Sequence, residues 1–214
     1  MGQTRQIVGP VLIWLLVAAV IGALIDVPAW SAELAETMAI EPWTNIGYVV
    51  SQIVMWVLVA TYAGMLLRTW ITKDHVPFTR LVFGGAATVV VYGINNLFLK
   101  ETYGKVRPCN VFETAGYCPG VENFSYPSNH TVIAFGLAMG LAFAIPWMSY
   151  IVFPLAIIEG IARVLAGHHY PHDVLAGAVL GMLGVLGALL MFVKVQASVA
   201  EKLSATRDKT TVES

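Results

Sequence analysis

The sequence predicts an all-α integral membrane protein whose six transmembrane helices form one bundle. Two observations support this fold class. Apolar residues make up 57% of the 214 residues and charged residues only 12%, whereas a soluble domain averages roughly 25% charged residues. The apolar residues also form long blocks that approach the roughly 20 residues a bilayer-spanning helix needs. In lipid each block must satisfy its own backbone hydrogen bonds, so each is expected to be a helix.

The apolar blocks follow one another without an internal repeat, and residues 1–195 are expected to form one domain. The blocks run over residues 7–27, 46–67, 81–98, 131–145, 148–165 and 174–193. The first block follows Arg5 and precedes the letters AWSA, so a cleaved signal peptide is the alternative for it. It is long for such a signal, and retaining it gives a consistent topology. Residues 196–214 are polar and are expected to form a disordered cytoplasmic tail.

Charge in the short loops predicts the orientation of the bundle, because Lys and Arg accumulate on the cytoplasmic side. Cations fall at the chain ends and in even-numbered loops, at Arg5, Arg68, Lys73, Arg80, Lys194, Lys202, Arg207 and Lys209. Carboxylates fall in the odd-numbered loops, at Asp26, Glu33, Glu36, Glu41, Glu101, Glu113 and Glu122. Both termini are therefore expected in the cytoplasm, and the odd loops on the periplasmic or extracellular face of a bacterial cell membrane.

The predicted outer loops hold two further features. Trp30, Leu34 and Met38 recur every four residues in segment 28–43, which fits a short interfacial helix as well as a plain loop. Cys109 and Cys118, the only cysteines, lie between the third and fourth blocks. An oxidising exterior permits a disulfide between them, and two free thiols are the alternative.

Small residues line one side of the sixth block. Gly177, Gly181 and Gly184 recur at helical spacing, which allows helices to approach closely in lipid. Packing within the chain is favoured over a dimer face, so a monomer is the expected state. The bilayer and a lipid are the expected partners, and no nucleic acid is expected.

Three polar clusters fall at the outer ends of the predicted helices. They are KETYGKVRP after the third block, YPSNHT before the fourth and GHHYPHD before the sixth. Lys100, Lys105, Arg107 and Arg163 lie on this side against the charge bias, which an anionic ligand would explain. Ser128 is a good helix N-cap, and the free N–H groups after it form an anion site. Positive charge, a helix start and histidines on one face are what phosphoryl transfer needs.

The order and spacing of these residues resemble the signature of the type 2 phosphatidic acid phosphatases. The three parts are Lys100-x6-Arg107-Pro108, Pro127-Ser128-Asn129-His130 and Arg163-x5-His169-x3-Asp173. The family comprises integral membrane lipid phosphatases that share a fold with vanadium haloperoxidases and glucose-6-phosphatase. The signature spans residues 100–173, about a third of the chain, and the six-span layout extends the similarity to most of the rest.

Two positions depart from the family pattern. Asn129 stands where the second part usually has glycine, and Ala162 stands where the third part usually has serine before the arginine. Asparagine tolerates left-handed geometry better than most residues and keeps its backbone N–H, so contact with the phosphate is expected to survive. The alanine puts one hydrogen bond to the phosphate in question.

The resemblance implies a mechanism that needs neither cofactor nor metal. His169 attacks phosphorus and forms a phosphohistidine, while Asp173 fixes and stabilises its imidazole. His130 protonates the leaving oxygen and then activates water. The phosphate oxygens are held by Lys100, Arg107, Arg163 and the backbone N–H groups near Ser128 and Asn129.

Three polar residues within the third and fifth blocks are expected to play supporting roles. Glu159 lies four residues before Arg163, where a carboxylate is costly without a partner. Pairing with Arg163, which it would orient, is favoured over direct catalysis. Asn95 and Asn96 precede Lys100 by about one turn and are expected to form interhelical hydrogen bonds rather than to bind a ligand.

The expected substrate is a polyprenyl (di)phosphate or a glycerolipid phosphate at the outer leaflet, with no recognition of a large headgroup. Alternatives within the resemblance are a lipid phosphotransferase, a polyprenyl-phospho-sugar phosphatase and a haloperoxidase-like activity. Alternatives from other classes are a non-enzymatic anion-binding or transport protein and a metal site at His168 and His172. Pro171 disfavours the helical geometry that such a histidine pair needs. His168 and His172 are therefore expected to be bystanders at the membrane surface.

Overall fold

The computed structural model of the protein is a helical bundle and describes residues 2–26, 28–38, 40–112 and 116–212. In chain order the elements are α1 (Gly2–Ala23), α2 (Ala29–Met38), α3 (Trp43–Ile71), α4 (His75–Ile94), the π-helix η1 (Asn95–Leu99), α5 (Lys100–Tyr103), the 3-10 turn η2 (Pro108–Asn110), α6 (Asn129–Ala144), the 3-10 turn η3 (Pro146–Met148), α7 (Ser149–Leu165), α8 (Pro171–Met191) and α9 (Val193–Val212). Positions used in the sequence predictions that lie outside the described residues are Val27, Glu113 and 213–214, together with the side chains of Arg5, Arg207 and Lys209.

The predicted all-α membrane fold class is confirmed. Among the described residues, four segments are long and apolar enough to cross a bilayer: Trp43–Ile71, His75–Asn110, Pro146–Leu165 and Pro171–Met191. Val8–Ala23 and Asn129–Ala144 are apolar but shorter. Large apolar side chains also stand exposed on the outside of the bundle, as on α3 and α4. Exposed apolar surface of this extent is typical of a protein whose solvent is lipid.

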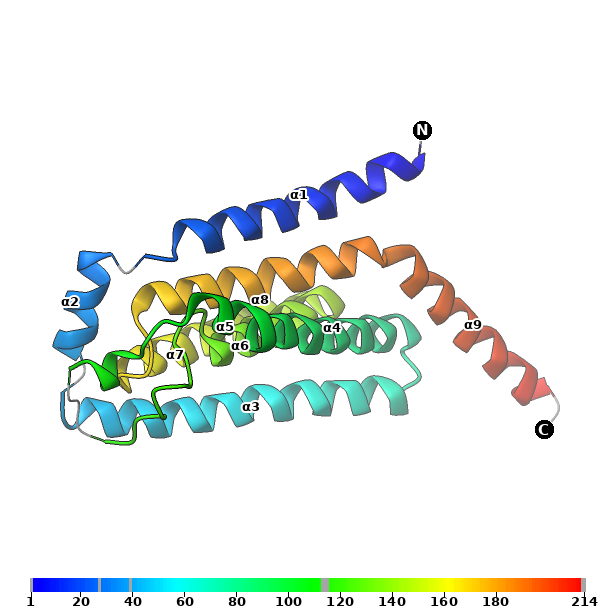
Figure 1. Ribbon diagram of the computed structural model, residues 1–214. Helices are drawn as coiled ribbons and strands as arrows, with labels where there is room; N and C mark the ends of the chain where they lie inside the picture. Colours follow the sequence, from blue (N-terminus) through cyan, green and yellow to red (C-terminus); the bar gives the residue numbers. More distant parts are fainter. Residues whose placement is uncertain (1, 27, 39, 113–115, 213–214) are drawn as a thin grey trace.

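Helix α6 lies at the centre of the bundle and packs against α8, α4, α7 and α3. It separates two apolar cores, one that includes Leu58 and Val152 and one that includes Val17 and Leu180. Figure 1 shows that both chain ends lie at one end of the bundle, whereas α2, α5 and the connection from α5 to α6 lie at the other. The three polar clusters predicted from the sequence meet at this second end.

Glycines on α8 determine how closely it approaches its neighbours. A Cβ at Gly177 would lie 2.7 Å from the Ser128 carbonyl of α6, and one at Gly184 would lie 3.1 Å from Trp14 of α1. These glycines therefore pack within the chain, as expected. The close approach also brings the start of α8 to the start of α6, where the Ser128 N–H donates to the Asp173 carbonyl at 3.1 Å.

The segment before α3 and the C-terminal tail were the two regions whose structure the sequence left open or predicted to be disordered. Segment 28–43 contains a helix, α2, which buries Ser31 and Ala35. The polar tail, expected to be disordered, instead continues as α9. Gln196 is buried there and donates to the Leu189 carbonyl at 2.8 Å, and Ala, Glu, Lys and Leu in this stretch are good helix formers. Docking of α9 against α4 is the physical reason for the difference.

Candidate active site

His169 lies in the turn between α7 and α8 and is 1% exposed. Arg107 Nη1 lies 3.0 Å from its Nε2. Arginine can only donate, so Nε2 accepts this bond and the ring proton is on Nδ1. Nδ1 lies 3.4 Å from Ser125 Oγ and 3.5 Å from Asp173 Oδ2. Burial and the nearby Arg107 guanidinium hold the pKa of His169 well below its usual value, so the imidazole is neutral with its lone pair on Nε2.

Asp173 links the start of α8 to His169. Pro171 is the first residue of α8, as its sequence position predicts. The Asp173 Oδ2 atom accepts from the Tyr170 backbone N–H at 2.8 Å and also from Ser125 Oγ. The carboxylate therefore caps its own helix and faces His169 at the same time. Ser125 was not identified from the sequence; its place five residues before His130 is the only signal that could have indicated it.

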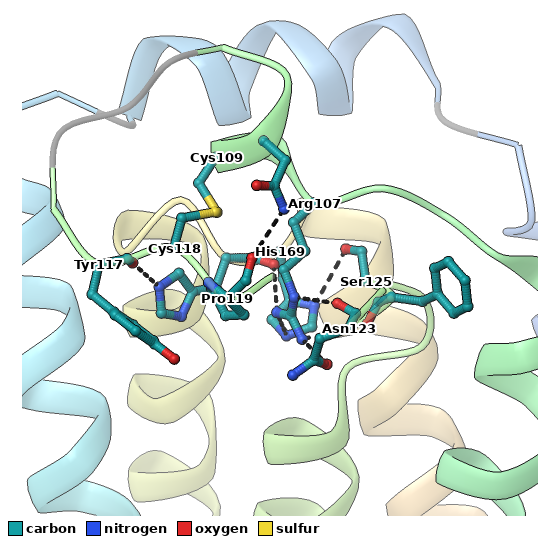
Figure 2. The surroundings of a disulfide bond; sticks show 11 residues. Arg107, Cys109, Tyr117, Cys118, Pro119, Asn123, Ser125 and His169 are labelled. Atoms are coloured by element: carbon teal, nitrogen blue, oxygen red, sulfur yellow. Dashed lines mark hydrogen bonds between the residues drawn. A yellow bond between two sulfur atoms is a disulfide. The ribbon is translucent and has the colours of Figure 1, made fainter. Parts of the chain in front are cut away.

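Arg107 uses every one of its donors within the protein (Figure 2). Nε donates to the Asn123 carbonyl at 2.6 Å, and Nη2 donates to Asn123 Oδ1 at 2.8 Å and to the Phe124 carbonyl at 3.3 Å. Nη1 donates to the His168 carbonyl at 2.9 Å in addition to His169. The guanidinium thus joins segment 123–124 to the histidine turn, and Asn123 is a second residue that the sequence did not indicate.

A cavity of about 280 Å³ brings the three parts of the signature together. Arg107, His130, Arg163 and His169 all line it, with Tyr48 and Gln52 of α3 among the remaining residues. Arg163 is 3% exposed, and its Nε has no hydrogen-bond partner among the described residues. A buried guanidinium N–H without an acceptor beside a neutral histidine is suited to an anionic group such as a phosphate.

Lys100 is placed apart from this cavity. It is 3% exposed and donates to the Phe124 carbonyl. It lines a neighbouring cavity of about 570 Å³ together with Asn96, Glu101 and Glu122. Asn123 lines both cavities. Segment 123–124 therefore separates the predicted phosphate-binding lysine from the histidines.

The start of α6 is held by two sets of polar contacts. Ser128 caps the helix, as predicted, and its Oγ accepts from the Thr131 hydroxyl at 2.9 Å. Asn129 Oδ1 accepts from Asn95 at 2.7 Å, and its Nδ2 donates to Asn96 Oδ1 at 2.7 Å. Both partners belong to the π-helix η1, a type of turn that is frequent at functional sites. The expected interhelical bonds of this asparagine pair are present, and they hold the residue that departs from the family pattern.

Glu159 does not contact Arg163 directly, in contrast to the expected pairing. Ser51 of α3 stands between them: its hydroxyl donates to Glu159 Oε1 at 2.6 Å and accepts from Arg163 Nη1 at 3.4 Å. The serine hydroxyl of α3 thus bridges two side chains of α7, and the arginine is oriented through this hydroxyl rather than through an ion pair.

His168 and His172, expected to be bystanders, are both buried inside the protein, with 1% and 0% exposure. His168 Nε2 lies 2.7 Å from the Tyr117 carbonyl, whereas His172 Nδ1 lies 2.9 Å from Ser31 Oγ of α2. His168 lies in the turn before α8 and His172 lies within α8, and the two rings have different partners. They therefore do not form the pair on one helix that the alternative metal site would need.

Cys109 and Cys118 are joined by a disulfide with 5.9 Å between their Cα atoms (Figure 2). The bond anchors the segment that presents the Tyr117 carbonyl to His168. The Cys109 N–H also donates to the Gly167 carbonyl at 2.9 Å. The covalent link thus supports the turn that carries His169.

The family model of the PAP2 superfamily matches residues 54–197. The chain belongs to the PAP2 superfamily. This match covers α6, α7 and α8 and every residue of the three-part signature, and it confirms the resemblance seen in the sequence. The curated relatives of this PAP2 chain are matched over less than two thirds of their own length.

Three relatives indicate the range of the family. Undecaprenyl-diphosphatase BcrC of Bacillus subtilis is 25% identical over 58% of this chain and 64% of its own. Lipid A 4'-phosphatase of Bacteroides thetaiotaomicron is 33% identical over 51% and 49%. Phosphatidylglycerophosphatase B of Bacillus subtilis is 34% identical over 50% and 57%.

A solved structure shares the fold of this PAP2 chain. The crystal structure of a transmembrane PAP2 type phosphatidylglycerolphosphate phosphatase from Bacillus subtilis matches with a TM-score of 0.56 at 23% identity. The match covers 84% of this chain and 93% of the solved one. It therefore extends the similarity beyond the signature to most of the helices.

Proposed function

We propose that this PAP2 protein is a metal-independent lipid phosphate phosphatase that acts through a phosphohistidine on His169. The observation that carries the proposal is the state of His169: a buried, neutral imidazole whose Nε2 lone pair is opposite the cation Arg107 and at a cavity also lined by His130. The three relatives described above are all named as phosphatases of membrane lipids, which supports the same chemistry.

In the first step His169 Nε2 forms a bond to phosphorus, and the bond from phosphorus to the lipid oxygen breaks. His130, which takes up a proton when the anionic phosphate binds beside it, supplies that proton to the lipid oxygen. Asp173 accepts a hydrogen bond from Nδ1–H and stabilises the imidazolium that forms. Before this attack, as the substrate binds, Arg107 Nη1 turns from Nε2 to a phosphate oxygen and frees the lone pair, and the unpartnered Nε of Arg163 is available for a second oxygen.

In the second step water attacks the phosphohistidine. His130 takes a proton from the water, the nitrogen–phosphorus bond breaks, and inorganic phosphate leaves. Backbone N–H groups near Ser128 and Asn129 at the start of α6 and the Lys100 ammonium complete the positive environment. In the proposed topology six spans place this site at the outer leaflet of a bacterial cell membrane, with both termini in the cytoplasm.

A polyprenyl (di)phosphate or a glycerolipid phosphate is the proposed substrate. A second candidate, the terminal phosphate of a polyprenyl-phospho-sugar, is favoured by the 570 Å³ cavity beside the histidines. Glu101, Glu122 and Asn123 line that cavity, where their carboxylates and amide could form hydrogen bonds with the hydroxyl groups of a sugar. A lipid phosphotransferase would use the same phosphohistidine with a lipid alcohol in place of water.

The test is phosphate release by the purified protein from a panel of these lipids, with and without a chelator. We expect release that survives the chelator and is blocked by vanadate, together with loss of about 10³-fold or more in His169→Gln, as for other nucleophiles. Full activity in His169→Gln, or release that stops on chelation, would contradict the proposal. Release that falls as a lipid alcohol is added would identify the transferase.

A further inference from the structure

His172 is a second buried imidazole beside the proposed catalytic carboxylate, and the mechanism above does not use it. Its Nε2 lies 3.2 Å from Asp173 Oδ1, the oxygen that does not face His169. Its ring lies between two aromatic rings, with centroids 5.8 Å from Tyr126 and 5.5 Å from Tyr170. Both histidine and carboxylate are 0% exposed, so water does not compete for either atom.

Contacts with α2 favour one tautomer of His172. Ser31 Oγ accepts from the His172 backbone N–H at 3.3 Å, so the serine hydroxyl proton is available for Nδ1 at 2.9 Å. A hydroxyl that donates to Nδ1 leaves the ring proton on Nε2. The Nε2 atom then carries a hydrogen 3.2 Å from Asp173 Oδ1. The two atoms are not aligned as a hydrogen bond, and neither has a hydrogen-bond partner among the described residues, so a small rotation of either group would satisfy both.

The two carboxylate oxygens of Asp173 therefore lie close to different groups. Oδ2 faces Ser125, the Tyr170 N–H and His169, whereas in the described part of the chain only His172 approaches Oδ1 at ion-pair distance. A buried carboxylate oxygen without a donor is costly. Without His172, rotation of the carboxyl group would let Oδ1 compete for the donors on the other side, and Oδ2 would lose its fixed direction toward His169.

We infer that His172 is a positioning residue for phosphoryl transfer, which holds Asp173 Oδ1 through Nε2–H while Ser31 of α2 fixes its tautomer. The inference rests on the proposed roles of His169 and Asp173. It gives α2 a function as well, since a side chain of this helix controls the histidine that orients the catalytic carboxylate. The three histidines of GHHYPHD then have three different roles: His168 binds the Tyr117 carbonyl, His169 attacks phosphorus and His172 positions the Asp173 carboxylate.

Two substitutions at one site separate positioning from packing. His172→Phe keeps a ring between Tyr126 and Tyr170 but removes the N–H, whereas His172→Gln keeps a donor at a similar place. We expect kcat to fall about 10- to 100-fold in the Phe variant, the loss expected for one hydrogen bond to a charged group, with KM within about two-fold. The Gln variant should recover most of kcat. A folded Phe variant with kcat near wild type, or equal losses in both, would overturn the inference.

A measurement independent of catalysis examines the same contacts. Histidine ¹⁵N spectra of the labelled protein in nanodiscs, assigned by difference with His172→Gln, should show His172 as the Nε2–H tautomer. Ser31→Ala should convert it to a mixture and lower kcat, and this smaller change tests the inference even if His172→Phe fails to fold. An Nδ1–H tautomer in the wild type would overturn it. Absence of phosphate release by the wild type would refute the proposed function and leave the tautomer result to stand.

Discussion

At the scale of single residues, the hydrogen bonds of Arg107 determine how a phosphate can enter the site beside His169. All the N–H groups of Arg107 are bonded within the protein, one of them to the proposed nucleophile. A phosphate can therefore bind only by taking over some of these bonds. Because hydrogen bonds between an arginine and a phosphate are stronger than those to neutral acceptors, the exchange is favourable. It also frees Nε2 at the moment when phosphorus arrives.

Burial of the histidines has a consequence for stability against pH. The pKa of His168 is lowered to about 4, chiefly by burial and then by Arg163, and the pKa of His169 is lowered as well. In the unfolded chain both titrate near 6.5, so the unfolded state binds protons first as the pH falls. The stabilising effect is thus complete above about pH 6.5 and is lost below it, by about 1.4 kcal/mol per pH unit for each group.

Thermal unfolding in detergent between about pH 7 and about pH 5 measures this slope. His168→Gln keeps a donor for the Tyr117 carbonyl and removes one titrating group, so its melting temperature should fall less steeply with acid than that of the wild type. Identical slopes in the two proteins would show that His168 does not remain neutral in the fold.

At the scale of elements, the π-helix η1 and the start of α6 act together. Asn95 and Asn96 of η1 hold Asn129 through two side-chain bonds of 2.7 Å. Asn129 precedes His130, and η1 leads directly into Lys100. The asparagine that replaces the family's usual glycine thus connects the helix start that carries His130 to the turn that positions the lysine.

A double-mutant cycle tests this connection. Asn96→Ala should lower kcat/KM severalfold when residue 129 is Asn, and should have little further effect in an Asn129→Gly background. The expected coupling is about 0.5–3 kcal/mol, as for residues in direct contact. Equal effects of Asn96→Ala in both backgrounds would mean that the bond between the two side chains is irrelevant to the site.

At the scale of the whole molecule, local sequence patterns predicted the helices and their ends, but they did not predict the contacts between residues distant in sequence. Apolar blocks predicted the long helices that precede α9. Ser128 and Pro171 marked two helix starts, because capping depends on neighbours in sequence. Three serines make long-range bonds at the site that the sequence did not indicate: Ser31 to His172, Ser51 to Glu159 and Ser125 to Asp173, across 141, 108 and 48 residues. A serine has no local pattern that indicates such a partner.

The same limit applies to the tail and to the lysine. Polar composition favoured disorder after residue 195, whereas Gln196 is buried and bonded to α8. Lys100 belongs to the signature, yet the fold of segment 123–124 places it in a neighbouring cavity. Both outcomes depend on tertiary contacts, which composition and spacing do not contain.

The phosphoenzyme itself provides the most direct test of the proposed function. Protein incubated with a phosphate-labelled lipid substrate is quenched in base, in which phosphohistidine survives, and its peptides are analysed by mass spectrometry. His130→Ala should slow release of the phosphoryl group and increase the labelled fraction. We expect one phosphoryl group on His169, lost in acid and absent from His169→Gln. Turnover that releases phosphate without labelling His169, or a label that persists in His169→Gln, would contradict the mechanism.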